Sequence, residues 1–422
     1  MSDTHRLTLL VRAGLLIALL FSIYLVSRQA IAAWYFEEGS PEAIQAAIAW
    51  DPGNPRYYDA LANLMHSTAA NEKPGELIRL EETAARLSPY DAYYWADLGA
   101  AYDWTGRTAD AARAFARAQQ LFPNSPNINW RVANFYIRTQ HLRDGLRCLQ
   151  KVLLEGGVPR RDVFLLATNA TRENRAILDE MLPRGAAYFI DYINFQVALG
   201  RMEAAVESWD RLLELNLPFT LRDSFPYLDG LIEHRELESL ARAWAALSAR
   251  FPAQIRPRSG SRNSISNGDF ESEILNGGID WRVAPVEGAQ VSLDSGSSGE
   301  LSGSLRIDFD GTRNLDYFHL FQFVPVTPAT QYDFSVRMRA KGITTDSGPR
   351  FQLYDADDMG KLFLSTENLI GNVEWSEHHL KFSAGPATRL LVVRVARPAS
   401  KKFDSHIAGT VWIAHVSLAP VK

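Results

Sequence analysis

The sequence is poor in cysteine, and this scarcity limits its covalent chemistry. Cys148 is the only cysteine among 422 residues, so the chain can form neither an intramolecular disulfide nor a thiolate metal cluster. A basic excess is missing too, because 44 Lys and Arg stand against 49 Asp and Glu. Binding to a phosphate backbone requires clustered positive charge. We therefore do not expect nucleic acid as a partner.

Recognisable catalytic motifs are also missing. The sequence contains no G-x-S-x-G elbow, no Walker A loop, no H-E-x-x-H helix and no G-x-G-x-x-G fingerprint. Its nine histidines are scattered, and the neighbours His378 and His379 fall in a strand pattern that points them to opposite faces, where they cannot chelate one metal together. We expect a protein that is not an enzyme.

A long apolar run is present near the N-terminus. Leu7 to Val26 is apolar apart from Arg12 and three hydroxyl-bearing residues, and 20 helical residues span about 30 Å, the thickness of the hydrocarbon core. Arg6 precedes this run, whereas Glu37 and Glu38 follow it. The positive-inside rule therefore predicts a single-pass protein of the inner (cytoplasmic) membrane, with its N-terminus in the cytoplasm and its body extracytoplasmic, in the periplasm.

A cleaved signal peptide is the alternative interpretation of this segment. Ala30-Ile31-Ala32 matches the small-residue pattern of signal cleavage and closely follows the apolar run. Arg28 between the run and that pattern is unusual for a cleaved signal, and a helix continuing to Phe36 would carry the span into the next domain. We expect residues 1–36 to form a cytoplasmic tip and a retained anchor, with cleavage left open.

A period of 34 residues organises the region 37–255. Its clearest unit, residues 92–125, has small and large residues at fixed positions: Trp95, Leu98, Gly99, Tyr102, Gly106, Ala111, Phe115, Ala118 and Pro123. The small residues allow two antiparallel helices to cross closely, and the large ones fill the space between them. This spacing resembles the tetratricopeptide repeat (TPR).

The same pattern continues on both sides of this unit. Residues 126–159 follow in phase, residues 160–185 are interpreted as a divergent helical pair, and two further units run to Pro252. A wider spacing between Pro52 and Pro89 predicts a longer turn around Asn71 to Gly75. Five or six hairpins that cannot bury their apolar faces alone predict a stacked α-solenoid.

The resemblance to TPR proteins implies a concave face that binds a peptide or another protein. Trp104, Trp130 and Arg131 fall outside the packing positions of the repeat. They are therefore the candidates for the binding groove.

The composition changes after Pro252. Residues 256–264 have the polar composition of a linker, and residues 265–422 alternate apolar and polar side chains, as in Tyr332 to Arg339. About ten such runs predict an antiparallel β-sandwich. The whole chain is thus predicted to be multidomain α plus β.

Several short motifs narrow the type of sandwich. The succession of Asn267-Gly268-Asp269-Phe270-Glu271, then Trp281, Gly303 to Ile307 and Val411 to Leu418 resembles the galactose-binding-like jelly roll of carbohydrate-binding modules. In that family an early Glu and an Asp in the last strand often hold a structural calcium ion. Glu271 matches, but Ala414 and His415 occupy the place of the usual aspartates, so the resemblance implies at most a weak calcium site and otherwise no cofactor.

If the sandwich binds sugar, aromatic rings should stack on it while polar neighbours hold its hydroxyls. The candidates are Trp281, Tyr317, His319, Tyr354 and Trp375, with Arg337 or Arg394 as hydrogen-bond donors. In the run from Leu315 to Phe323, strict alternation places Tyr317, His319 and Phe321 on one face and Phe318 and Leu320 on the other.

Two functions remain open. The first is a cell-envelope scaffold whose repeats bind a membrane-protein partner, accessory to exopolysaccharide or O-antigen assembly and export, where proteins resembling this arrangement occur. The second is a carbohydrate-binding targeting subunit of a glycan-degrading system. The identity of the partner and of the sugar, and the oligomeric state, do not follow from the sequence.

Overall fold

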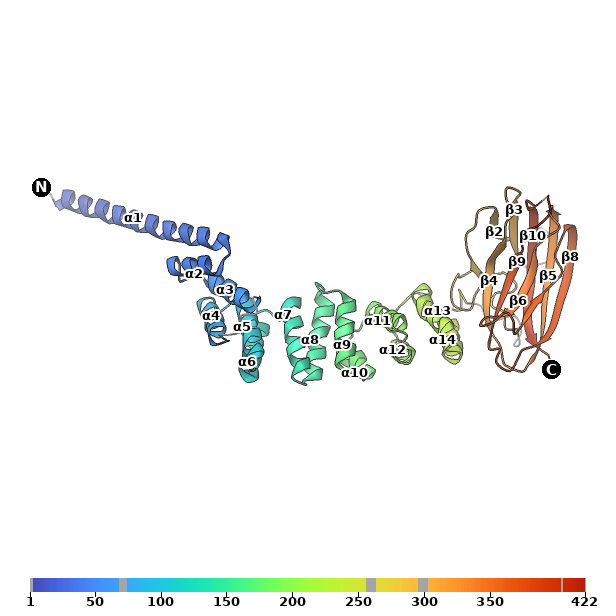
Figure 1. Ribbon diagram of the computed structural model, residues 1–422, viewed down its shortest axis with the longest axis horizontal. Coiled ribbons are helices and arrows are strands. Elements are labelled where there is room, and N and C mark those ends of the chain that lie inside the picture. The colour runs from blue at the N-terminus through green and yellow to red at the C-terminus, as the bar shows by residue number, and fades with distance from the viewer. Residues whose placement is uncertain (1–2, 68–73, 256–262, 295–302, 404, 422) are drawn as a thin grey trace. The chain divides into compact units, whose positions relative to one another are not determined.

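The computed structural model describes residues 3–67, 74–255, 263–294, 303–403 and 405–421 (Figure 1). Within these ranges the chain forms fourteen α-helices, one short 3-10 helix and ten strands, and every helix precedes every strand. The predicted order of a helical region followed by a β-sandwich is therefore confirmed. The predicted linker 256–264 lies mostly outside the described residues, as does the first part of the predicted turn around Asn71 to Gly75.

The chain divides into two compact units, Met1–Tyr188 and Phe189–Lys422, so the last two helix pairs belong with the strands. The helices are α1 (Asp3–Glu38), α2 (Pro41–Trp50), α3 (Pro55–Ser67), α4 (Pro74–Leu87), α5 (Ala92–Trp104), α6 (Thr108–Leu121), α7 (Pro126–Arg138), α8 (Leu142–Glu155), α9 (Arg160–Ala170), α10 (Asn174–Glu180), α11 (Ala186–Ala198), α12 (Met202–Glu214), the 3-10 helix η1 (Leu221–Ser224), α13 (Phe225–Glu233) and α14 (Leu237–Arg250).

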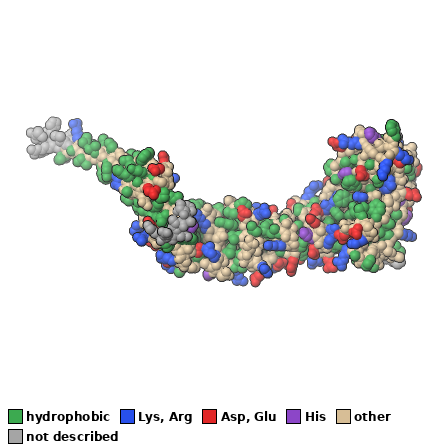
Figure 2. All heavy atoms as spheres, in the orientation of Figure 1, with side chains coloured by type: hydrophobic (Ala, Val, Ile, Leu, Met, Phe, Trp, Pro, Cys, Tyr) green, Lys and Arg blue, Asp and Glu red, His purple; other side chains and the backbone are tan. Residues whose placement is uncertain are grey.

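Helix α1 contains the predicted apolar run. Its segment Leu10–Glu38 is long and apolar enough to cross a membrane, a criterion that a signal sequence also meets. Hydrophobic side chains cover much of its visible surface (Figure 2), and Leu20 and Phe21 are more than half exposed. Near its C-terminal end the helix is packed against other residues: Ala32 is fully buried in a cluster with Ile44 of α2.

The turns between paired helices repeat with the period of the sequence. Gly106 has a φ of +77°, and Gln140, one period later, has a φ of +65°. The residue after each of them donates its N–H to a carbonyl five positions earlier: Arg107 to Tyr102 and His141 to Tyr136, both at 2.8 Å. A left-handed residue followed by this hydrogen bond ends a helix in the Schellman motif. The period therefore reflects one helix-ending geometry used at equivalent positions.

Close helix crossing explains the small residues of the clearest unit. A Cβ added to Gly99 on α5 would lie 2.8 Å from the Phe115 ring on α6, and Ala111 and Ala118 of α6 are fully buried. A larger side chain at position 99 would separate the two helices. The packing predicted for these four residues is confirmed.

The strands form two five-stranded sheets in which every pairing is antiparallel, as far as the described residues extend. We call the sheet of order β1-β4-β9-β6-β7 sheet A and the sheet of order β2-β3-β10-β5-β8 sheet B. The strands are β1 (Arg282–Val283), β2 (Ala289–Asp294), β3 (Ser304–Asp310), β4 (Tyr317–Pro325), β5 (Gln331–Ile343), β6 (Arg350–Asp355), β7 (Phe363–Ser365), β8 (Gly371–Ser383), β9 (Leu390–Arg397) and β10 (Ala408–Pro420). Both sheets contribute to one hydrophobic core, which includes Phe334 of β5 and Phe351 of β6.

A β-bulge makes the strict alternation predicted for β4 wrong. The register between β4 and β9 shifts between Tyr317 and Leu320. Tyr317 and Leu320 are both buried, whereas Phe318 is 47% exposed and His319 is half-buried. The extra residue of a bulge resets the inside and outside positions that follow it. Tyr317 therefore does not share a face with His319.

Within the second unit, the loop before β1 packs on the last helix pair. A Cβ at Gly277 would lie 2.4 Å from the Phe225 ring, and one at Gly278 would lie 2.5 Å from the Trp244 ring. Arg282 of β1 forms an ion pair with Asp229 of α13. The sandwich is thus joined to α13 and α14 by packing and charge as well as by the chain.

Candidate functional site

A cluster of aromatic and polar side chains lies on the outer face of sheet A, which is the face turned away from the core. In β9, Val393 and Val395 point into the core, so Arg394 between them points outward. The β-sheet register pairs Arg394 with Phe321 of β4 and with Gln352 of β6. The pleat therefore places an arginine at the centre of this face, with an aromatic residue and an amide as its cross-strand neighbours.

Two rings and one amide hold the Arg394 guanidinium. Its centre lies 4.8 Å from the centroid of the Tyr354 ring and 5.8 Å from that of Phe318. Its Nε and Nη2 both donate to Oε1 of Gln352, at 3.0 and 2.8 Å. We call Arg394, Tyr354, Phe318 and Gln352 the Arg394 cluster. Cation–π contacts and these hydrogen bonds fix the plane of the guanidinium.

His319 extends this cluster along β4. Its ring stacks on that of Phe318, with centroids 4.7 Å apart and an angle of 17° between the planes. Burial lowers the pKa of His319, which favours the neutral ring. Its Nδ1 accepts a hydrogen bond from the N–H of Phe318 at 3.4 Å, so Nε2–H is the donor that the neutral ring presents. Three of the residues predicted to bind sugar, His319, Tyr354 and Arg394, are therefore brought together here.

Two other predicted sugar-binding residues are placed where no ligand can reach them. Trp281 is fully buried and packs against Phe270 of the core, and its Nε1 donates to the carbonyl of Asn267 at 3.3 Å. Tyr317 is 1% exposed because of the bulge in β4. Both rings stabilise the core, and the prediction that they stack on sugar is wrong.

The remaining pair of candidates lies on the outer face of sheet B. The guanidinium of Arg337 on β5 lies 5.9 Å from the centroid of the Trp375 ring on β8. This face belongs to the opposite side of the sandwich from the Arg394 cluster. Sequence reasoning could not separate the two sets, because alternation alone does not say which strands share a sheet.

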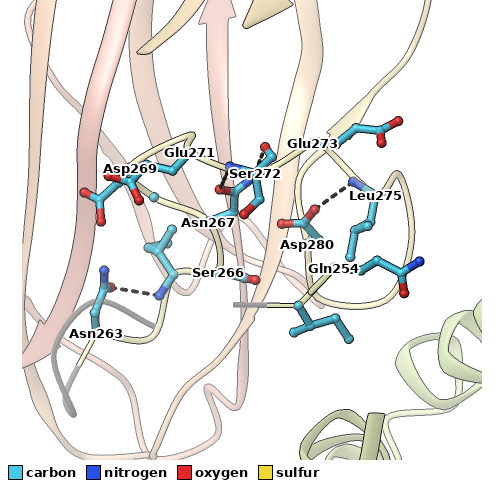
Figure 3. A pocket seen from close by; sticks show the side chains of 13 residues that line it. Gln254, Asn263, Ser266, Asn267, Asp269, Glu271, Ser272, Glu273, Leu275 and Asp280 are labelled. Carbon is cyan, nitrogen blue, oxygen red and sulfur yellow. Dashed lines mark hydrogen bonds between the residues drawn. The ribbon is translucent and has the colours of Figure 1, made fainter. Parts of the chain in front are cut away.

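Glu271, the residue predicted to hold calcium, lies at a small pocket beside the start of the sandwich (Figure 3). The pocket has a volume of about 70 Å³ and also contains Asp269, Glu273 and Asp280. Asp280 is buried and accepts a hydrogen bond from the N–H of Leu275 at 2.8 Å, while Glu273 extends away from it (Figure 3). In the described part of the chain, no three His, Cys, Asp or Glu side chains are placed to hold a metal ion.

The groove candidates lie on α5 and α7 of the first unit. Trp104 is 41% exposed. Its ring and the His66 ring lie in a T-shaped arrangement, with their centroids 5.3 Å apart. Trp130 is half-buried. Arg131 is engaged by an ion pair with Asp97 on α5. Of the three, Trp104 presents the most exposed aromatic surface.

A group of three carboxyl groups beside Arg131, of which that of Glu81 is buried and those of Asp59 and Asp97 are half-buried, was not predicted. Glu81 of α4 is 3% exposed, and burial, with Asp59 and Asp97 nearby, raises its pKa to about 9. Burial and the neighbouring Asp97 likewise raise the pKa of Asp59 to about 6. Glu81 stands one period before Phe115. Continuing the 34-residue step from that packing position would have revealed a carboxyl group in the repeat core.

No protein-family model matches the sequence, and no curated protein matches it. Among solved structures, a MamA protein is 14% identical, with a TM-score of 0.32; the match covers 47% of this chain and 98% of the MamA chain. A CBM4 structure is 17% identical, with a TM-score of 0.28; the match covers 37% of this chain and 100% of the CBM4 chain.

The active domain of tailspike protein 4 of bacteriophage CBA120 is 15% identical, with a TM-score of 0.28. It covers 38% of this chain, and the present chain spans only 21% of that protein. At these identities and TM-scores, the likenesses carry no conclusion about activity.

Proposed function

We propose that this chain is a membrane-attached, non-catalytic binding protein whose β-sandwich holds a glycan at the Arg394 cluster. The observation that best supports this is the Arg394 guanidinium, fixed by Gln352 and flanked by the Tyr354 and Phe318 rings. Aromatic rings stack on the apolar faces of sugars, and a fixed arginine donates to their hydroxyl groups. Phe318 at 47% exposure offers ring surface to such a ligand.

Pull-down on a panel of polysaccharides tests the glycan-binding role. Arg394→Ala should reduce retention about tenfold or more, because it removes the hydrogen-bond donors and the guanidinium that contacts both rings. Arg337→Ala is the matched control, since that arginine also lies over an aromatic ring but on the other sheet. Equal losses in the two variants, or no retention of the unaltered chain by any glycan, would reject the proposal.

The packing of α1 supports a retained anchor over a cleaved signal peptide. Cleavage after Ala32 would remove that fully buried residue from its cluster with Ile44 and Tyr57. It would also remove Arg28, which donates to the carbonyl of Trp50. N-terminal sequencing of the protein from membranes should find the segment before Ala33 still attached. A mature chain that begins at Ala33 would exclude the anchor.

The helical region is proposed to bind a protein partner, in an accessory role in exopolysaccharide or O-antigen assembly or export. Support comes from the repeat pattern, from the exposed ring of Trp104 and from the proposed membrane attachment, which suits this role better than that of a targeting subunit for secreted hydrolases. Crosslinking in membranes followed by mass spectrometry tests it. Capture of a polymerase or exporter is expected, and capture of a secreted glycan hydrolase would favour the alternative.

A further inference from the structure

Helix α2 folds back along α1, which brings its C-terminal end close to the apolar run. Gly39, with a φ of +72°, reverses the chain after α1, and the two helices lie side by side (Figure 1). The Nε and Nη2 atoms of Arg28 donate to the carbonyl oxygen of Trp50 at 2.9 and 2.6 Å. The last residue of α2 therefore lies beside a residue of α1 that follows Val26 by only two positions.

This contact sets the height of Trp50 above the apolar run. At a rise of about 1.5 Å per residue, Arg28 lies about 3 Å beyond Val26 along the helix. The headgroup layer on each side of a bilayer is roughly 5 to 7 Å thick. If α1 spans the membrane, Trp50 therefore lies within this layer.

The side chains at this level have the chemistry of a membrane interface. Trp50 is 40% exposed and Tyr24 is 55% exposed, although both are large aromatic residues. The packing face of α2 is formed by Ile44 and Ala47, which are buried against α1. Tryptophan and tyrosine are enriched where hydrocarbon meets the headgroups, and the Arg28 guanidinium, held by the Trp50 carbonyl, places a positive charge at the same level.

We propose that the end of α2 carrying Trp50 rests in the lipid headgroup layer beside the anchor and so holds the first helix pair at the membrane surface. This inference depends on the proposed membrane attachment. It commits to a lipid surface as the partner of this patch, because the patch is continuous with the exposed apolar side chains of α1. The repeats then begin at the bilayer, without a free tether between the span and the first helix pair.

Site-directed fluorescence in lipid nanodiscs tests the inference on the full chain. Cys148 is the only cysteine and is buried, so Cys148→Ser gives a background for single labels. A dye on Trp50→Cys should be quenched at least threefold more by spin-labelled headgroups than a dye on Phe122→Cys. Phe122 is a matched control because it is 46% exposed and lies at the end of another helix, α6.

Two further positions keep the outcomes distinct. Gly53→Cys, in the exposed turn after α2, retains Trp50 and should be quenched like position 50. Leu20→Cys, on the exposed apolar part of α1, reports the span itself through lipids labelled in their acyl chains. Quenching at 20, with positions 50 and 53 no more quenched than 122, would overturn this inference alone. No quenching at 20 would overturn the membrane attachment as well.

Discussion

Asp97 on α5 and Arg131 on α7 form an ion pair between two positions that are 34 residues apart in the sequence. The bond therefore joins equivalent positions of two neighbouring repeats. Asp103 and Arg138 make a second ion pair between the same two helices. Arg131 also faces Asp59 and Glu81. Burial, with Asp59 and Asp97 nearby, outweighs the compensation by Arg131 and raises the pKa of Glu81 to about 9, so its carboxyl group stays protonated at pH 7.

Glu81→Leu should stabilise the first unit by about 1 to 3 kcal/mol, because a buried polar group without full compensation is replaced by an apolar one of similar size. The equivalent position one period later is Phe115, which is buried. Among the described residues, Oε2 of Glu81 has no hydrogen-bond partner that the substitution would remove. Urea unfolding followed by circular dichroism measures the change. Glu82→Leu, at the exposed neighbouring position, should bring no gain, because Glu82 accepts a hydrogen bond from Tyr102.

The free energy of unfolding of the first unit should fall as pH rises. The pKa of Glu81 is about 9 in the folded state and 4.5 by reference, so between these values the folded state binds a proton that the unfolded state lacks. The resulting stability is fully present below about pH 4.5 and is lost as pH approaches 9, with a slope of at most about 1.4 kcal/mol per pH unit. Asp59 adds to this between its reference pKa of 3.8 and about 6.

Glu81→Gln isolates the contribution of Glu81, because the amide resembles the protonated acid and cannot ionise. Asp59, Asp97 and Arg131 remain as the charged neighbours. Unfolding curves at pH 6, 7 and 8 should converge for this variant and stay separated for the unaltered chain. Parallel pH dependence in the two proteins would mean that Glu81 does not hold the extra proton.

The sequence predicted packing better than it predicted exposure. Trp95, Gly99 and Phe115 follow from the repeat because their sizes are dictated by the helix crossing. Glu81 was missed because a pattern of apolar sizes has no place for a carboxyl group. Among the sandwich candidates, the bulge in β4 turns Tyr317 into the core. This bulge arises in the pairing of β4 with β9, which lies far along the chain. Sequence alternation gives a period of two but not the partner strand.

Arg397→Met should destabilise the sandwich by at least about 3 kcal/mol, because hydrogen bonds to a buried charged group are strong and their acceptors would be left unpaired. The Arg397 side chain is fully buried. It donates to the Asn314 side chain and to the carbonyls of Leu315, Ser347 and Ser405, at 2.7 to 2.9 Å. Its hydrogen bonds thus connect three loops, those between β3 and β4, between β5 and β6, and between β9 and β10.

The control for Arg397 is Arg394→Met, the same substitution three residues earlier on the outer face of β9. It should cost about 1 kcal/mol or less, because that guanidinium is half-buried and its Nε and Nη2 hydrogen bonds both go to the single amide oxygen of Gln352. Denaturant unfolding followed by tryptophan fluorescence compares the two. Equal losses of unfolding free energy in the two variants would show that the burial of Arg397 does not determine its contribution to stability.

Gly278→Ala should loosen the sandwich from the last helix pair of the second unit. Its φ is +57°, and a Cβ there would lie 2.5 Å from the Trp244 ring and 2.9 Å from Leu228. Two costs therefore add: about 1 to 2 kcal/mol for a left-handed alanine and about 1 to 3 kcal/mol for overpacking.

Gly342→Ala is the matched control, because Gly342 has a φ of +67° but nothing within 4 Å of its added Cβ, so only the first cost applies. Hydrogen exchange should accelerate in α13 and α14 for Gly278→Ala and not for Gly342→Ala. Unchanged exchange in both variants would mean that the loop does not hold the sandwich to these helices.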